Sequence, residues 1–213
     1  IHIIMFQLAV VYVFAGIAKL NYHWLFEAQP LINWLKHQTD LPLIGPLMKF
    51  EFTAYLFSWG GALFDLTIPF LLLSARFRIP GYLLVVLFHG LTAVMFPIGV
   101  FPYVMIISTL IFFPESFHEK IIHSLRILFK TKNENQIAVE TTKNLNKRNI
   151  QTSLIALYVA FQIIVPLRYL LYDGDLFWTE QGYRFSWRVM LIEKVGYAQF
   201  FVHDPTTDNK KLI

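Results

Sequence analysis

The sequence has no cysteine and few charged residues. Charged side chains make up 15% of the 213 residues, against roughly 25% in an ordinary soluble domain. The absence of cysteine excludes thiol catalysis, cysteine-based metal sites and a disulfide-stapled secreted module. The scarcity of charge argues against a disordered chain or a nucleic-acid-binding arm, so we expect no nucleic-acid partner. No phosphate-binding loop, dinucleotide fingerprint or serine-nucleophile motif occurs in the sequence.

Apolar residues dominate instead, at 56% of the chain. A helix needs about 20 mostly apolar residues to cross a bilayer. Five runs approach that length, and the fourth reaches it only if residues 98–102 are included. These runs cover residues 3–18, 52–73, 79–96, 103–113 and 154–167. We therefore predict an all-α integral membrane helical bundle with about five spans, in contact with the lipid bilayer.

The basic residues indicate the orientation of these runs. Arg76 and Arg78 follow the second run, and seven more Lys and Arg residues lie between Lys120 and Arg148. The positive-inside rule places both loops in the cytoplasm. Lys19, the turn expected at residues 96–102 and the tail then share the opposite side, periplasmic or lumenal, and a bacterial inner membrane fits this arrangement.

The chain divides into a transmembrane domain, residues 1–172, and a non-cytoplasmic tail, residues 173–213. Within the first, residues 115–129 predict an amphipathic helix and residues 130–149 a polar cytoplasmic loop. In the tail, residues 197–202 alternate with period 2 and predict the first strand of a hairpin, with turn chemistry from His203 onward. A lone hairpin is unstable, so we expect this to be the start of an extramembrane β domain. The chain opens inside an apolar run, so we also expect a piece of a longer protein.

Lys19, at the end of the first run, is the first candidate for chemistry. It can be an anchor whose ammonium reaches the membrane surface along an apolar stem. Alternatively, burial just inside the apolar zone disfavours the charged form and leaves an amine that can act as a base. The small residues before it, Ala15, Gly16 and Ala18, would let a helix or a flat ligand approach closely.

Asp65 and His89 are the other candidates, because each interrupts an apolar run. A carboxylate inside a membrane segment is costly unless it is paired or faces a cavity, so Asp65 is either a structural partner of another helix or part of a site. His89 is either an interhelical hydrogen-bond partner or a catalyst. No cysteine and no HExxH spacing accompanies it, so we expect no metal site.

Three blocks of the sequence carry a family resemblance. They are VYVFAGIAKLNYHW at residues 11–24, GGALFDL at 60–66 continuing to FHG at 88–90 and FPIGVFPYVM at 96–105, and the stretch 166–187 with WTEQGYRFSW. In order and spacing they resemble the vitamin K-dependent gamma-glutamyl carboxylase family, including its bacterial relatives with an HTTM domain. The resemblance extends over nearly the whole chain.

The resemblance implies a chemistry for each candidate. Lys19 would be the amine base that deprotonates a reduced vitamin K or menaquinone-type hydroquinone. O2 and CO2 would be co-substrates and no metal would be needed. A glutamate-containing peptide or protein would be carboxylated at the γ-carbon. His89 would line the quinone and glutamate region, and Asp65 would be a buried polar support. Ala18 stands where animal members have a second basic residue.

Two alternatives remain open at this point. One is a quinone-oxygenating membrane enzyme that keeps the hydroquinone half of the reaction but acts on another substrate. The other is a non-catalytic membrane scaffold in which Lys19 is an anchor and Asp65 a packing group. The Lys19 amine would lie in a closed apolar pocket in the enzymes, and at the membrane surface in the scaffold.

Overall fold

Four helices in the described part of the chain are long and apolar enough to cross a membrane. The structure, a computed structural model, describes residues 1–129, 145–194, 196, 198–203 and 210–212. The four are α1 (His2–Lys19), α4 (Glu51–Leu73), α5 (Arg78–Met95), and α8 (Leu145–Ile164) with η3 (Val165–Leu171), in which the apolar span is Asn149–Leu171. These helices indicate an integral membrane protein.

Four of the five predicted runs form helices of spanning length. The fourth run forms only α6 (Phe101–Thr109) and η2 (Leu110–Phe112), which together are too short. The cause is the predicted break before it: Phe96 ends α5 in an extended conformation and Gly99 has a φ of 64°. Pro102 then occupies the first turn of α6, where its missing N–H has no partner to lose.

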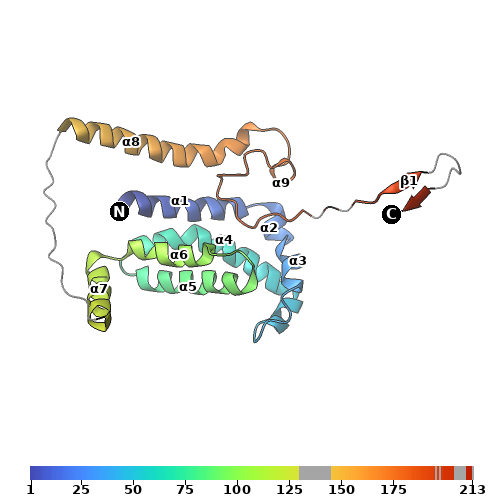
Figure 1. Cartoon of the computed structure of the whole chain (residues 1–213), viewed down its shortest axis with the longest axis horizontal. Helices are drawn as coiled ribbons and strands as arrows, with labels where there is room; N and C mark the ends of the chain where they lie inside the picture. Colours follow the sequence, from blue (N-terminus) through green and yellow to red (C-terminus); the bar gives the residue numbers. More distant parts are fainter. Residues whose placement is uncertain (130–144, 195, 197, 204–209, 213) are drawn as a thin grey trace.

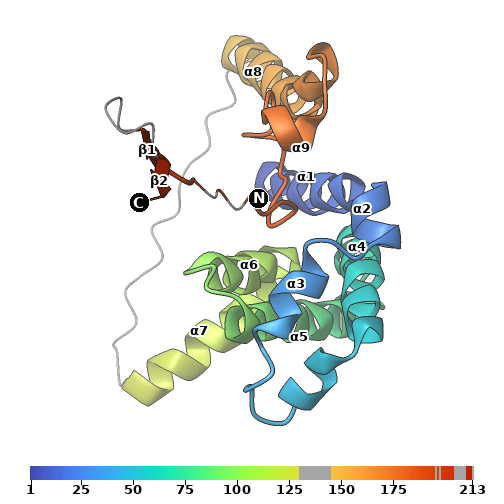
Figure 2. The same ribbon diagram turned by 90° about the vertical axis from the view of Figure 1, so that its right-hand side faces the viewer.

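The helices form a bundle around α1. Figures 1 and 2 show α1 between α8 on one side and the group of α4, α5 and α6 on the other. Close packing of α1 on α4 depends on Gly16, because a Cβ there would lie 2.7 Å from the Leu66 Cγ. Across the other contact, the Tyr158 hydroxyl of α8 donates a hydrogen bond of 2.7 Å to the Gln7 side-chain oxygen of α1.

Short helices gather at the Lys19 end of the bundle. They are α2 (Tyr22–Phe26), α3 (Leu31–Lys36), η1 (Gly45–Lys49) and α9 (Leu176–Thr179). Figure 1 shows α2, α3 and α9 at this end, while α7 (Glu115–Phe129) lies at the other. Lys19 and the tail therefore share one end, as the loop charges predicted. The amphipathic helix predicted at residues 115–129 is confirmed, whereas most of the polar loop, residues 130–144, lies outside the described residues.

The tail contains a short hairpin. Strand β1 (Phe201–His203) pairs antiparallel with β2 (Lys210–Leu212), and Phe201 lies opposite Leu212. The predicted strand thus starts later than the alternation indicated, and its turn, residues 204–209, lies outside the described residues. Whether a larger β domain follows stays a prediction.

Candidate functional site

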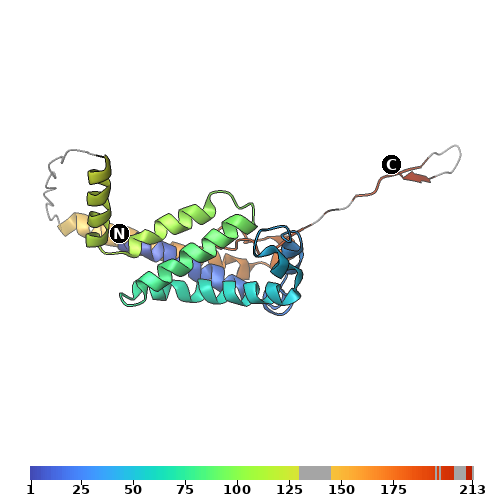
Figure 3. The same ribbon diagram turned by 90° about the horizontal axis from the view of Figure 1, so that it is seen from below.

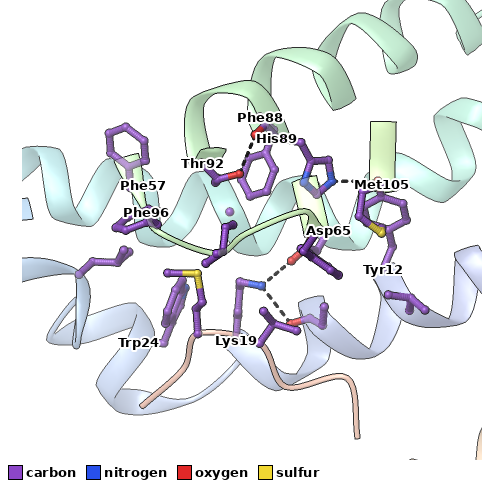
Figure 4. A pocket seen from close by; sticks show the side chains of 18 of the residues that line it. Tyr12, Lys19, Trp24, Phe57, Asp65, Phe88, His89, Thr92, Phe96 and Met105 are labelled. Atoms are coloured by element: carbon purple, nitrogen blue, oxygen red, sulfur yellow. Dashed lines mark hydrogen bonds and ion pairs between the residues drawn. The ribbon is translucent and has the colours of Figure 1, made fainter. Parts of the chain in front are cut away.

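A largely apolar cavity of about 110 Å³ lies near the Lys19 end of the bundle. Its walls come from α1, α4, α5, the start of α6, the short helices α2 and α3, and residues 189–190 of the tail. Aromatic rings form much of the lining, as Figure 4 shows. They belong to Tyr12, Trp24, Trp34, Phe57, Phe88, Phe96 and Phe101.

Lys19 turns into this cavity and does not extend toward the membrane surface. Its Nζ lies 2.5 Å from Oδ2 of Asp65, and it also approaches the Ala15 carbonyl at 3.5 Å (Figure 4). The exposed fraction is 8% for Lys19 and 5% for Asp65. The Trp24 ring, with its centroid 5.6 Å from Nζ, covers the amine from the α2 side. The last residue of α1 and the interior of α4 thus form one buried ion pair.

His89 forms a second polar pair in the same cavity. The Tyr12 hydroxyl lies 3.1 Å from His89 Nε2, and the exposed fractions of the two residues are 1% and 4%. Phe64 stacks on Phe88 with a centroid distance of 4.0 Å and forms a T-shaped pair with the His89 ring at 6.0 Å. The imidazole is therefore held by one hydrogen bond from α1 and by rings from α4 and α5.

The structure brings all three predicted site residues, Lys19, Asp65 and His89, to this one cavity. Sequence reasoning missed Tyr12. The signal was its spacing, since residues seven apart lie on one face of a helix and Tyr12 is seven residues before Lys19. Among the described residues, no group of three His, Asp or Glu side chains is arranged to hold a metal ion.

The tail forms the last wall of the cavity. Val189 and Met190 line it, and two contacts from neighbouring residues hold this stretch against the helices and α9. Trp34 Nε1 of α3 donates a 2.8 Å hydrogen bond to Glu193, and Lys194 lies 2.6 Å from Glu180. The hydrogen bond from Lys194 lowers the pKa of the Glu180 carboxyl from its ordinary value.

A wider and more polar groove opens beside this wall. It lies between α2 and α3 on one side and α9 with residues 191–194 on the other. Polar side chains of both signs line it: Asn21, His23, Asn33, Lys36, His37, Asp175, Glu193 and Lys194. The tail, α2 and α3 each contribute residues both to this groove and to the apolar cavity.

Comparison with known families matches two parts of the chain. The family model described as the HTTM domain matches residues 1–117. The chain belongs to the HTTM family. Residues 147–213 match the model described as the vitamin K-dependent gamma-carboxylase lumenal domain, so this HTTM protein is a relative of the vitamin K-dependent gamma-carboxylases. No solved structure matches the chain.

Both matched segments of this HTTM protein line the apolar cavity. Tyr12, Lys19, Asp65 and His89 lie in the HTTM match, and Val189 and Met190 lie in the lumenal-domain match. The resemblance stated from the sequence is confirmed at the level of the family. The chemistry at these residues is taken up next as a proposal.

Proposed function

We propose that this protein is a carboxylase-like membrane enzyme in which Lys19 is the base that deprotonates a lipidic hydroquinone. The observation that carries the proposal is the placement of the Lys19 amine. It lies in a cavity of aromatic rings, paired with Asp65 and near His89, rather than at the membrane surface. A scaffold would need no such arrangement, because burying an ion pair in apolar surroundings costs free energy.

The cavity residues fit the ring of a reduced vitamin K or menaquinone-type quinone. Flat apolar rings such as Trp24 and Phe88 offer stacking surfaces, and Lys19 supplies a basic atom at the cavity wall. When bound, the hydroquinone would supply, with O2, a base strong enough to remove a γ-proton from glutamate and so allow the attack on CO2. The position between apolar helices suits a ligand that arrives from the lipid.

Asp65 has a definite part in this proposal, because an ammonium cannot accept a proton. Lys19 first transfers one proton to the Asp65 carboxylate, over the 2.5 Å that separates them. Both groups are then neutral, which apolar surroundings favour over two charges. The Lys19 amine next takes the hydroxyl proton of the hydroquinone, and the pair ends with one more proton and one more positive charge. Asp65 is a proton partner of Lys19 here, not only a packing group.

His89 and Tyr12 are proposed to position the ligand. Their hydrogen bond fixes the imidazole on the cavity wall beside Phe64 and Phe88. A fixed polar group among rings orients a flat ligand without a large change of its own position. His89 and Tyr12 are thus assigned positioning roles from their place in the cavity wall, whereas Lys19 is assigned a proton-transfer step.

We propose that the polar groove beside the tail admits the glutamate-containing peptide. It lies at the Lys19 end, and α2, α3 and the tail contribute residues both to it and to the cavity. On this proposal the transmembrane domain, residues 1–172, carries the base and the tail, residues 173–213, guides the peptide. The groove then faces the periplasm or lumen, and a bacterial inner membrane remains the proposed location.

The test is hydroquinone epoxidation by the full-length protein in nanodiscs, supplied with O2, bicarbonate and a glutamate-containing peptide. Lys19→Ala is expected to abolish epoxide formation. Lys49→Ala is the matched control, because Lys49 is exposed at the same end of the bundle, at the end of η1, and should leave the rate unchanged. Incorporation of labelled CO2 into the peptide is measured in the same reaction.

The outcomes separate the three candidate functions. Epoxide and carboxylated peptide that both depend on Lys19 support the carboxylase. Epoxide that depends on Lys19, without carboxylation of any glutamate peptide, supports the quinone-oxygenating enzyme with another substrate. Well-folded protein that forms no epoxide from any hydroquinone rejects both enzymes and leaves the scaffold.

A further inference from the structure

Helix α7 (Glu115–Phe129) is amphipathic, and it is exposed except near its start, where Phe117 and His118 are half-buried. None of its residues is buried. With 100° per residue, six of its seven apolar side chains occupy one arc, and its charged side chains lie on the opposite arc together with Ile127. The apolar arc, called here the α7 apolar face, consists of Phe117, Ile121, Ile122, Leu125, Leu128 and Phe129.

The place where α7 begins is fixed by the spanning helices. Only Phe113 and Pro114 separate it from η2. The Phe113 ring lies 5.4 Å from Tyr82, in the first turns of α5, and 4.4 Å from Phe117 of α7. Tyr82 is one turn from Arg78, where the apolar span of α5 starts. Helix α7 thus starts at the level where the apolar spans end.

The direction of α7 differs from that of the spans. Figures 1 and 3 both show it running across the end of the bundle, at the end opposite α2 and α3, whereas α1, α4, α5 and α8 run lengthwise. A helix that projects from the membrane into solvent does not require an apolar face of six residues. A helix that lies along the membrane surface needs that face on one side and charge on the other.

We propose that α7 lies in the plane of the membrane, with the α7 apolar face among the upper acyl chains and its charged arc toward the water. The occupant of this face is the phospholipid of the same membrane that the spans cross. Lys120 lies at the edge of the charged arc, where its stem can follow the apolar surface while its ammonium reaches the headgroups. The helix would thereby fix the end of α6, which is too short to span by itself.

The charge on α7 predicts which lipids it needs. Glu115 and Glu119 balance Lys120 and Arg126, so attraction to anionic lipid contributes little compared with burial of the apolar face. Contact with the membrane should therefore persist in purely zwitterionic bilayers and at high salt. This separates α7 from polybasic surface helices, whose binding falls as salt rises.

Single cysteines introduced into α7 of the full chain test the proposal. The chain has no native cysteine that would have to be removed first. Spin labels are placed by Ile121→Cys, Leu125→Cys and Leu128→Cys on the apolar face, and by Glu119→Cys and His123→Cys on the other arc. The protein is reconstituted in phosphatidylcholine vesicles. We expect the first three labels to relax mainly with oxygen and the other two mainly with a water-soluble nickel reagent, at low and at high salt.

Two results would overturn the proposal. Nickel accessibility at all five positions would place α7 in water. Shielding of the apolar positions from both reagents would mean that protein covers this face, whether from a second copy or from another chain. Cysteine at exposed helix positions is a mild change, so loss of folding does not confound the scan.

A pair of charge substitutions gives a second readout. With a label at Leu128→Cys, the added change Leu125→Glu should reduce oxygen accessibility several-fold, because a carboxylate on the apolar face lifts the helix from the acyl chains. The change His123→Glu lies on the charged arc, opposite the apolar face, and should leave the label where it was. Equal effects of the two changes, or none from either, would contradict membrane contact by the apolar face.

Discussion

Lys19 Nζ lies 2.5 Å from Oδ2 of Asp65, a residue 46 positions later in the chain. Both side chains are almost entirely shielded from solvent. Each charge is therefore compensated by the other in apolar surroundings. The pair joins the end of α1 to the interior of α4, next to the cavity. Stability and the proposed chemistry therefore depend on the same contact.

We expect single and double replacements of this pair to be strongly non-additive in stability. Asp65→Leu or Lys19→Met alone leaves one buried charge without a partner and should cost about 3–5 kcal/mol. The double variant removes both charges and should recover most of that loss. Thermal unfolding in detergent, followed by loss of monodisperse protein, measures the cycle. Additive losses would show that the two groups do not depend on each other.

The kinetics of hydroquinone epoxidation should show whether Asp65 takes part in proton transfer or has only a structural role. On the proposed proton transfer, Asp65→Asn is expected to lower kcat for hydroquinone epoxidation at least tenfold with little change in KM, because the cavity lining is kept. Asp65→Glu, which restores the carboxylate, should recover part of the rate. A variant that loses hydroquinone binding and turnover together would argue for a packing role instead.

The contact of α8 with α1 rests in part on Tyr158 and Gln7. Tyr158→Phe removes one hydrogen bond of 2.7 Å while keeping the ring. Interhelical hydrogen bonds in membranes contribute about 0.6 kcal/mol on average, so the loss of stability should be of that order. The matched control is Tyr103→Phe, at an exposed position of α6, which should change nothing. Thermal unfolding of the two variants in the same detergent makes the comparison.

Replacement of glycine by alanine should have different effects on stability at Gly16 of α1 and at Gly60 of α4. Gly16→Ala places a Cβ 2.7 Å from Leu66 Cγ and 3.0 Å from its backbone nitrogen, so α1 and α4 must separate. Overpacking of this kind costs about 1–3 kcal/mol. Gly60→Ala, in α4, meets nothing within 4 Å and should be neutral or slightly stabilising. Melting temperatures of the two variants in the same detergent make the comparison.

Closure of the cavity by the tail depends on Trp34. Trp34→Phe keeps an aromatic ring at the wall but removes the hydrogen bond of 2.8 Å to Glu193. The stretch that carries Met190 should then open more often, since loops held by few bonds open locally at small cost. Hydrogen exchange of residues 189–194 is expected to speed up, while exchange in α4 and α5 stays unchanged. Unaltered exchange at the tail would mean that other contacts hold it.

The sequence allowed the spans and the site residues to be predicted, but not their pairing. Apolar runs and loop charges are local signals, so α1, α4, α5 and α8 and the shared end of Lys19 and the tail could be inferred. The helix at α6 is shorter than the predicted span because length was counted across the bend at Gly99, where the helix is interrupted. The pairing of Lys19 with Asp65 depends on the relative position of α4 and α1 along their axes. The close approach of Gly16 to Leu66 helps to fix that position, and it cannot be inferred from a local sequence pattern.

Tyr12 and the tail wall illustrate the same limit. The helical spacing of Tyr12 and Lys19 was visible, but a tyrosine on an apolar helix is ordinarily a core residue. Its partner His89 lies across the bundle and 77 positions away in the chain. Residues 189–190 carry no charge and no motif. Their place at the cavity follows from contacts made by their neighbours, Glu193 with Trp34 and Lys194 with Glu180.

The tail wall also sets an order of events during synthesis. A chain emerges from its N-terminus, so α1, α4 and α5 can bring Lys19, Asp65 and His89 together long before residues 189–190 exist. Until α8 has crossed the membrane and carried the tail over, one flank of the cavity has no cover. A nascent chain arrested before residue 173 would hold the polar groups in place yet leave them open to water. The cavity is completed only after residues 189–190 have arrived.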